Sequence, residues 1–316
     1  MACCGPSPNR IGKNRELNMN NNLKRIVVRF FWMLLGRKRL VRFARMLTRA
    51  SRLDGENQMG VNGELLVIDT ALKHARGEEH SPTLVDCGAN VGDYSIQFAR
   101  RAKDIGLSKI SLHLFEPASA TLVTLRKKLS LELPGLPVVV NQAALSDSAR
   151  EMFFYVVHDN AGVNSQLAGD FSPASYTETV SVNTLENYCK SQEIEKILLL
   201  KIDTEGNDYN VLAGAKNLLM CGAIDLVQFE YNYRWIYARR YLRDVFELIC
   251  ATDMRLGKVT AHGIEFYEEW HPELETFTEG NYLLCGSEWV QRFPKIEWWG
   301  EGLKRRAGKS QNGSVP

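Results

Sequence analysis

The sequence predicts an α/β protein with a mostly parallel sheet and helices on both faces. From residue 83 onward, short apolar runs alternate with amphipathic stretches, and a glycine-rich turn follows the first run. The repeated order of strand and helix is typical of open parallel sheets. The length of 316 residues, with 45% hydrophobic and 24% charged residues, allows one such domain with appendages.

Two kinds of periodicity define the elements. Short apolar runs bounded by turn residues predict strands, and apolar positions three and four residues apart predict helices. The predicted strands are 83–88, 109–116, 138–145, 151–160, 178–185, 197–203, 224–231, 254–260 and 281–286. The predicted helices are 64–75, 93–103, 117–130, 207–219 and 241–252. The two strands at 151–160 and 178–185 are predicted to be antiparallel, around a loop at 161–175.

Charge is distributed unevenly along the chain. Residues 1–60 hold thirteen Lys/Arg and three Asp/Glu, whereas the remainder holds twenty-six and thirty-four, so the net charge of +2 combines a basic arm with a mildly acidic body. An acidic body does not favour nucleic-acid binding. We divide the chain into a disordered N-terminus (1–22), a basic helical arm with a leading helix (23–80), the α/β domain (81–290) and a partly disordered tail (291–316).

The basic arm is amphipathic but too short to span a membrane. Its most apolar run, 26–35, holds about ten residues and is interrupted by Arg29, and a spanning helix needs about twenty. Beyond it, one helical face carries Leu40, Phe43, Ala44 and Leu47, and the opposite face carries Lys38, Arg42, Arg45 and Arg49. This helix either lies on an anionic membrane surface or docks on its own domain.

The seven cysteines are dispersed, and no CxxC pair occurs. This usage is typical of a reducing compartment and argues against a disulfide framework. We therefore expect a cytoplasmic protein, membrane-associated if the arm binds lipid. No feature of the sequence indicates an oligomeric state.

The turn after the first predicted strand carries the strongest functional signal. In "LVDCGANVGDYS" (84–95), Asp86 closes the strand, and Gly88 and Gly92 leave the backbone open to a ligand. The next helix directs free N–H groups towards negative charge. Glu116, at the end of the second strand, can bind ribose hydroxyls in either a dinucleotide or an S-adenosylmethionine (SAM) site. The GxNxG spacing lacks a third glycine for a pyrophosphate, so it favours SAM.

Four motifs carry a resemblance to a known family. The segments "LVDCGANVGDYS", "LFEP", "NQAALSD" and "LKIDTEGNDYNVLAGA" resemble the FkbM family of SAM-dependent methyltransferases, over residues 83–285. The resemblance implies a class I methyltransferase (Rossmann-like) three-layer sandwich, with a seven-stranded, mostly parallel sheet whose last strand is antiparallel. It also implies methylation of hydroxyl oxygens on a sugar, glycan or secondary metabolite. The residues implied to contact SAM are Asp86, Gly88, Asn90, Gly92 and Glu116, with Gln142 and Ala143 near the adenine.

Carboxylates at the ends of two later strands are the catalytic candidates. Asp203, Glu205 and Glu230 are expected to face the same crevice as the glycine turn. We predict Asp203 as the general base or as the group that orients the acceptor hydroxyl. Alternatively, Asp203 caps the next helix, Glu205 interacts with that helix's dipole, and Glu230 pairs with Arg234. Three such carboxylates can also hold Mg²⁺, but no histidine or clear ligand spacing accompanies them, so we predict no metal ligands.

A polar loop is the predicted acceptor site. Within "HDNAGVNSQL" (158–167), His158, Asn160 and Asn164 offer hydrogen-bonding groups for a small-molecule or glycan acceptor. No residue in this loop identifies the acceptor.

Three other functions remain open on the sequence alone. A short-chain NAD oxidoreductase needs a YxxxK pair, and none of Tyr231, Tyr233, Tyr237 and Tyr241 has a lysine four residues later. A non-catalytic SAM-fold binding protein would retain the turn without the reaction. A methyltransferase acting on protein or nucleic acid is a further alternative. Nucleic acid is disfavoured because "DTEG" stands where a (D/N)PP(Y/F/W) tetrapeptide is expected.

Overall fold

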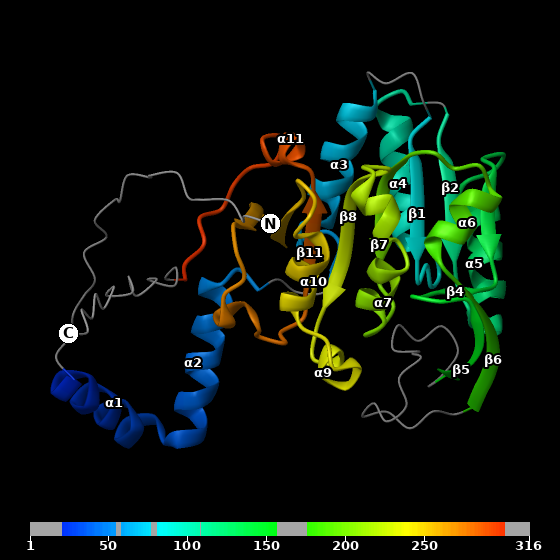
Figure 1. Ribbon diagram of the computed structural model, residues 1–316. Helices are drawn as coiled ribbons and strands as arrows, with labels where there is room; N and C mark the ends of the chain where they lie inside the picture. The colour runs from blue at the N-terminus through cyan, green and yellow to red at the C-terminus, as the bar shows by residue number, and fades with distance from the viewer. Residues whose placement is uncertain (1–20, 55–57, 77–80, 108, 157–175, 301–316) are drawn as a thin grey trace, which may run out of the picture. The chain divides into compact units, whose positions relative to one another are not determined.

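The computed structural model describes residues 21–54, 58–76, 81–107, 109–156 and 176–300 (Figure 1). The chain divides into two compact units, Met1–Ser51 and Arg52–Pro316. Of the two end segments, 1–22 and 291–316, residues 1–20 and 301–316 lie outside the described residues, and so does the loop at 161–175.

The first unit contains two helices, α1 (Asn21–Leu35) and α2 (Arg37–Ser51). Gly36 separates them with a positive φ of 72°, which glycine adopts without steric cost. Neither helix contains a buried residue. Over the part of the chain that the structure describes, we find no helix with the length and apolar character to cross a membrane.

The second unit is built on an eight-stranded sheet. Its strands, in spatial order, are β10 (Gly263–Tyr267), β9 (Arg255–Thr260), β11 (Gly280–Cys285), β8 (Ile224–Tyr231), β7 (Ile197–Ile202), β1 (Thr83–Cys87), β2 (Ser111–Phe115) and β3 (Val138–Asn141). The strands from β3 to β8 pair in parallel, and β11 is antiparallel to both β8 and β9. The α/β class and the antiparallel last strand are thus confirmed.

The predicted number of seven strands is one too low. The additional strand, β10, forms an antiparallel hairpin with β9 at the edge of the sheet. Its segment, "GIEFY", follows β9 after only two intervening residues. Three of its five residues are Ile, Phe and Tyr, but the segment is short and its pairing depends on the edge that β9 offers.

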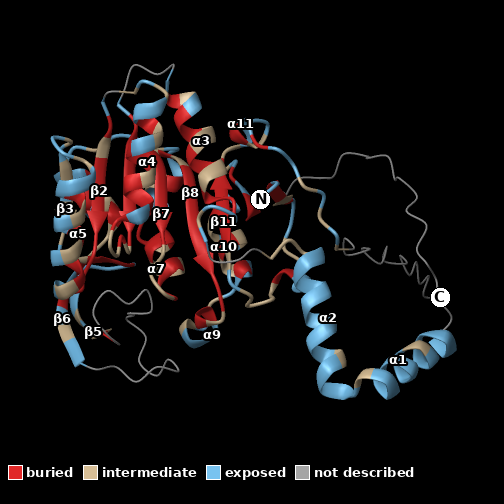
Figure 2. Cartoon of the chain, turned by 180° about the vertical axis from the view of Figure 1, so that it is seen from behind, coloured by how far each residue is buried: buried red, intermediate tan, exposed pale blue. Residues whose placement is uncertain are grey.

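Helices cover both faces of the sheet and form three layers. They are α3 (Glu64–Ala75), α4 (Asp93–Asp104), α5 (Ser119–Glu132), α6 (Leu185–Ser191), α7 (Asp208–Ala213), α8 (Lys216–Met220), α9 (Arg234–Ala238), α10 (Leu242–Ile249) and α11 (Ser287–Val290), with a 3₁₀ turn at Pro272–Leu274. Leu84 of β1 packs in one core with α3, α4 and α5, and its neighbour Val85 packs in the other with α6, α7 and α10. Figure 2 shows the buried residues concentrated along the central strands.

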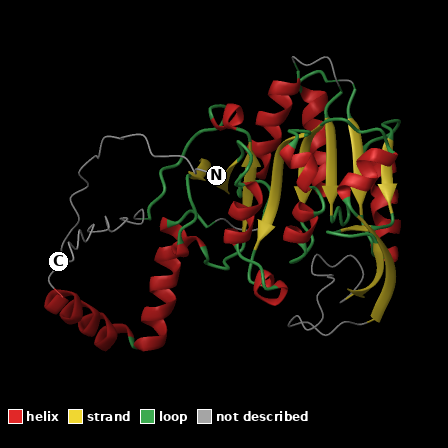
Figure 3. Cartoon of the chain, viewed as in Figure 1, coloured by secondary structure: helices red, strands yellow, loops and turns green. Residues whose placement is uncertain are grey.

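A small second sheet lies on the β2–β3 side of the domain (Figure 3). It contains β4 (Ala144–Leu145), β6 (Tyr176–Asn183) and β5 (Arg150–Val156) in that order. β5 and β6 are antiparallel, as predicted. The predicted strand at 138–145 is divided, because its first half joins the large sheet and its last two residues pair with β6.

Candidate active site

The glycine turn after β1 has the left-handed geometry that its sequence predicts. Gly88, Asn90 and Gly92 have φ values of 80°, 47° and 85°. The N–H groups of Gly88 and Ala89 both donate to the Phe115 carbonyl oxygen, at 3.0 and 2.9 Å. A Cβ on Gly88 would lie 1.9 Å from the backbone oxygen of Asp203. The turn is therefore packed directly against the chain that leaves β7.

Glu116 holds this turn in place from the end of β2. Its buried carboxylate accepts hydrogen bonds from the N–H groups of Asn90 and Ala118, each at 2.9 Å. Burial raises the pKa of Glu116 to about 7, although these two hydrogen bonds oppose the shift. Glu116 thus positions the backbone around it and presents a carboxylate that titrates near neutral pH.

Asp86 and Gly92 support the turn from behind. Asp86 is buried and accepts a hydrogen bond of 2.6 Å from the Ser95 hydroxyl in α4. Burial raises the pKa of Asp86 to about 6. Gly92 precedes α4, and a Cβ there would lie 2.6 Å from Leu125 Cδ1. Neither residue lines the adjacent cavity. Their predicted contacts with a cofactor stay predictions.

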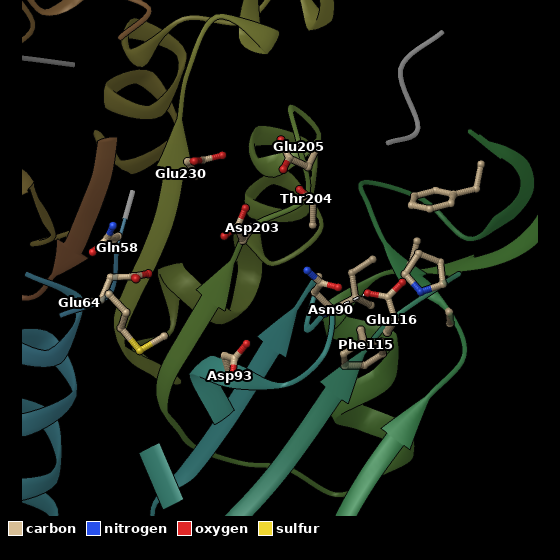
Figure 4. Close-up of a pocket in the computed structure, with 17 residues that line it drawn as sticks. Gln58, Glu64, Asn90, Asp93, Phe115, Glu116, Asp203, Thr204, Glu205 and Glu230 are labelled. Carbon is tan, nitrogen blue, oxygen red and sulfur yellow. Dashed lines mark hydrogen bonds between the residues drawn. The ribbon is translucent and has the colours of Figure 1, made fainter. Parts of the chain in front are cut away.

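A cavity of about 560 Å³ opens at the carboxyl ends of the parallel strands (Figure 4). Small-molecule sites commonly have volumes of about 300–1,000 Å³. Asn90, Glu116, Ala143 and Phe154 line one part of the cavity, and the predicted carboxylates line another. Gln142, predicted to lie near the adenine, is exposed between β3 and β4 and is not part of this lining.

The structure brings the three predicted carboxylates together. Asp203 directly follows β7, Glu205 lies two residues later with a φ of 55°, and Glu230 is the penultimate residue of β8. One oxygen from each lies within 4.8 Å of the others, so the three can jointly hold a proton or a cation. Figure 4 shows all three beside the cavity.

The cluster is electrostatically strained by burial and mutual repulsion. Burial, followed by repulsion from Asp203, raises the pKa of Glu205 to about 8, although Arg234 opposes the shift. The same two causes, with Glu205 adding to them, raise the pKa of Glu230 well above its usual range. Arg234 Nη1 lies 2.5 Å from Glu205 Oε2, and Asn232 donates to Glu230 at 2.7 Å. At neutral pH, protons are therefore retained within the cluster.

Asp208 organises the turn that carries these groups. Its carboxylate accepts hydrogen bonds from the N–H groups of Thr204 and Gly206, at 3.3 and 3.1 Å. The N–H of Asp203 donates to the Cys87 carbonyl oxygen at 2.9 Å, which extends the β1–β7 pairing past the end of the strand. The N-cap of α7 is Asn207, with no side-chain cap hydrogen bond, so Asp203 does not take the capping role that we considered for it, and its side chain lines the cavity.

Sequence reasoning missed a buried charge pair beneath the cavity. Lys201 Nζ lies 3.2 Å from Glu64 Oε1 and 3.3 Å from Asp203 Oδ2. Burial alone would lower the pKa of Lys201, but Asp203 and Glu64 outweigh it and raise the pKa well above its usual range. The available signal was a lysine in the otherwise apolar strand "ILLLKI", because a charge on a buried strand requires a partner.

Phe154 was also missed, and three predicted residues are not placed. Phe154 of β5 is buried and lines the same cavity as Ala143. Its position depends on the small sheet, which the sequence pattern did not connect with the turn. His158, Asn160 and Asn164, the predicted acceptor residues, lie outside the described residues.

Comparison with known proteins identifies the family. The model of the methyltransferase FkbM domain matches residues 86–275, which is more than half of the chain. A solved methyltransferase FkbM from Methylobacillus flagellatus KT is similar at 13% identity and a TM-score of 0.43, over 69% of this chain and 47% of that one. An O-methyltransferase from Bacillus cereus is similar at 11% identity and a TM-score of 0.38, over 78% and 88%.

The bifunctional kinase-methyltransferase WbdD is similar at 13% identity and a TM-score of 0.38, over 75% of this chain and 39% of that one. The chain therefore spans less than half of the solved FkbM protein and of WbdD. No curated protein matches it. The assignment rests on the domain match, by which the chain belongs to the FkbM methyltransferase family.

Proposed function

We propose that this protein is a SAM-dependent methyltransferase that methylates a hydroxyl group of a sugar, glycan or secondary metabolite. The main support for the proposal is that one continuous cavity adjoins both groups of residues. It extends from the Asn90–Glu116 hydrogen bond at the glycine turn to the carboxylate cluster of Asp203, Glu205 and Glu230. The proposed cofactor subsite and the proposed proton-accepting subsite would thus adjoin each other in one cavity.

The residues at the glycine turn fit SAM. Asn90 Oδ1 is buried and, among the described residues, has no hydrogen-bond partner, so it offers an acceptor to a ligand in the cavity. The Glu116 carboxylate can accept hydrogen bonds from ribose hydroxyls, and Phe154 and Ala143 offer apolar surface to an adenine. The start of α4 supports the binding of a carboxylate.

The carboxylate cluster supplies the route for the acceptor's proton. When bound, SAM supplies an electrophilic methyl group, so the protein must align the acceptor and remove its proton. Asp203 lines the cavity beyond the turn and is proposed to accept that proton. Glu205 and Glu230, whose pKa values are raised, can exchange protons with it. Arg234 and Lys201 fix the cluster in position.

A SAM titration tests the cofactor site. Glu116→Ala and Gly88→Val are expected to abolish binding, because the first removes the carboxylate at the turn and the second drives a side chain into the Asp203 backbone. Glu195→Ala is the control, because this glutamate is exposed in the turn before β7, away from the cavity lining. Wild-type affinity in both site variants would refute the assignment.

Turnover with a labelled methyl group tests the catalytic site. Asp203→Asn is expected to retain SAM affinity but lose transfer to any sugar, oligosaccharide or phenol that the wild type methylates. Asp104→Asn, an exposed charge change at the end of α4, serves as the matched control. An unchanged rate in Asp203→Asn would remove Asp203 from the mechanism.

The same assays distinguish the alternatives. Tight SAM binding without transfer to any acceptor would favour a non-catalytic binding protein. Transfer to protein or nucleic acid, but not to hydroxyl compounds, would change the acceptor class.

We infer a reducing, cytoplasmic setting from the cysteines; the five that the structure describes, Cys87, Cys189, Cys221, Cys250 and Cys285, are all free thiols.

A further inference from the structure

The helix α1 exposes apolar side chains around most of its circumference. Residues three and four apart on a helix share one face. In α1 this face carries Leu23, Ile26, Phe30, Met33 and Leu34. All five are exposed, from 48% at Leu23 to 82% at Met33. Arg29, three residues after Ile26 and four before Met33, borders this face, and Val28 and Trp32 on the other side of the helix are also exposed, at 54% and 51%.

The helix α2 also exposes apolar side chains and carries more charge. Leu40, Phe43 and Leu47 share one face, and Phe43 and Leu47 are 44% and 47% exposed. The opposite face carries Lys38, Arg42, Arg45 and Arg49. Together, residues 21–51 hold nine Lys/Arg and no Asp/Glu. Two adjacent helices thus combine exposed apolar side chains with a dense, single-sign charge.

We propose that α1 and α2 bind the surface of an anionic lipid bilayer, with their apolar faces in the acyl boundary and their basic side chains at the phosphates. Each helix has 15 residues, too few to cross a hydrocarbon core, which requires about twenty. Low net hydrophobicity, a basic polar face and an aliphatic or aromatic apolar face are typical of helices that lie in the membrane interface, and α2 has this composition. The adjacent α1 adds further exposed apolar side chains.

The combination of positive charge and exposed apolar surface favours an anionic bilayer over a nucleic acid or a second copy of the arm as the partner of α1 and α2. A nucleic acid would neutralise the arginines but leave Phe30, Met33 and Phe43 exposed to water. A second copy of the arm would cover the apolar faces but bring nine positive charges against nine more. An anionic bilayer satisfies both faces at once.

Vesicle co-sedimentation of the full chain tests the charge contribution. Wild type is expected to bind vesicles of phosphatidylcholine with phosphatidylserine, and to dissociate as salt is raised. Each basic residue near an anionic surface contributes about a fivefold change in partitioning. Arg42→Glu/Arg45→Glu should therefore weaken binding by at least about 25-fold. Lys103→Glu/Lys127→Glu, with the same charge change on exposed body helices, should bind like wild type.

A second variant tests the apolar contribution. Phe30→Ser/Met33→Ser leaves the charge unchanged and should also lose vesicle binding, because it removes two exposed side chains from the apolar face of α1. SAM titration of each sample reports that the catalytic unit is folded. It does so independently of lipid binding, so failure of the membrane proposal and failure of the proposed function can be told apart.

Three results would overturn the inference. Equal binding to vesicles of phosphatidylcholine alone would remove the charge argument. Wild-type vesicle binding by both arm variants would show that the contact lies elsewhere on the chain. Full binding by Phe30→Ser/Met33→Ser, together with equally tight binding to duplex DNA, would identify the arm as a general polyanion-binding surface.

Discussion

The close contact between the glycine turn and the end of β7 makes a specific prediction for Gly88→Ala. The added Cβ would lie 1.9 Å from the backbone oxygen of Asp203 and 2.9 Å from its carbonyl carbon. The atoms that it meets belong to the backbone, which cannot rotate away as a side chain can. The residue also has a φ of 80°, where an L-residue is strained.

Two contributions determine how much stability Gly88→Ala is expected to lose. A left-handed conformation costs a residue with a Cβ about 1–2 kcal/mol. Forcing an additional methyl group into a packed site costs about 1–3 kcal/mol more. We therefore expect a loss of about 2–5 kcal/mol in the free energy of unfolding. Because the turn must move away from Asp203, SAM affinity should fall as well.

Gly106→Ala separates these two contributions. Gly106 has a φ of 81°, yet a Cβ there meets no heavy atom within 4 Å. Both variants change the unfolded chain in the same way, so that effect cancels between them. Urea denaturation should show that Gly88→Ala costs about 1–3 kcal/mol more than Gly106→Ala. Equal losses, with unchanged SAM affinity in both, would refute the close-approach reasoning.

Three further predictions concern ionisable groups. The pKa of Glu116 is about 7, and its ionised form is the better hydrogen-bond acceptor. SAM affinity measured by calorimetry should therefore rise about tenfold between about pH 6 and pH 8. In Glu116→Gln the SAM affinity should not change over this pH range. Methyl transfer should continue in EDTA, because Lys201 and Arg234 already accompany the carboxylates; activity that requires added Mg²⁺ would contradict this. Lys201→Met should lower the free energy of unfolding by about 3–5 kcal/mol, because it leaves Glu64 buried without its cation. A double-mutant cycle with Glu64→Gln, measured by denaturation, should show that the two losses are coupled. Additive losses would show that the two residues act independently.

The α/β architecture was predictable because its central strands are buried on both faces. β7 reads as a nearly continuous apolar run, and β1 and β8 are apolar at most positions, a pattern typical of strands covered by helices. The helices between them have apolar positions that recur at helical spacing. These signals are local, so each can be read without knowledge of the rest of the chain.

Features that depend on contacts distant in sequence were not predictable in the same way. β10 exists because β9 offers it an edge, and the split of 138–145 occurs because β4 pairs with β6, which begins more than thirty residues later. The pair formed by Lys201 and Glu64 joins residues that no local pattern connects. Such features follow from the assembled sheet rather than from the composition of one segment.

The candidate site was predictable in its location but only in part in its internal roles. The ends of neighbouring parallel strands must meet at one edge, and this rule alone predicts that Asp203 and Glu230 lie near the glycine turn. Which carboxylate faces the cavity and which organises backbone depends on hydrogen bonds at the turn. Asp208 accepts two of them, from Thr204 and Gly206, and Asp86 accepts one from the Ser95 hydroxyl.

The charge balance of the cavity is suited to the proposed reaction. Four carboxylates, Asp203, Glu205, Asp208 and Glu230, lie around the ends of β7 and β8. Lys201 pairs with Asp203, and Arg234 pairs with Glu205. Methylation of a hydroxyl releases one proton. If the cluster takes up that proton while the sulfonium charge disappears, a cation and an anion become two neutral groups, and the net charge of the cavity does not change. Burial, which raises the pKa of Glu205 and Glu230, also makes the separated charges less stable than the neutral pair. Because burial destabilises separated charges, the cavity favours methyl transfer, which converts a cation and an anion into two neutral groups.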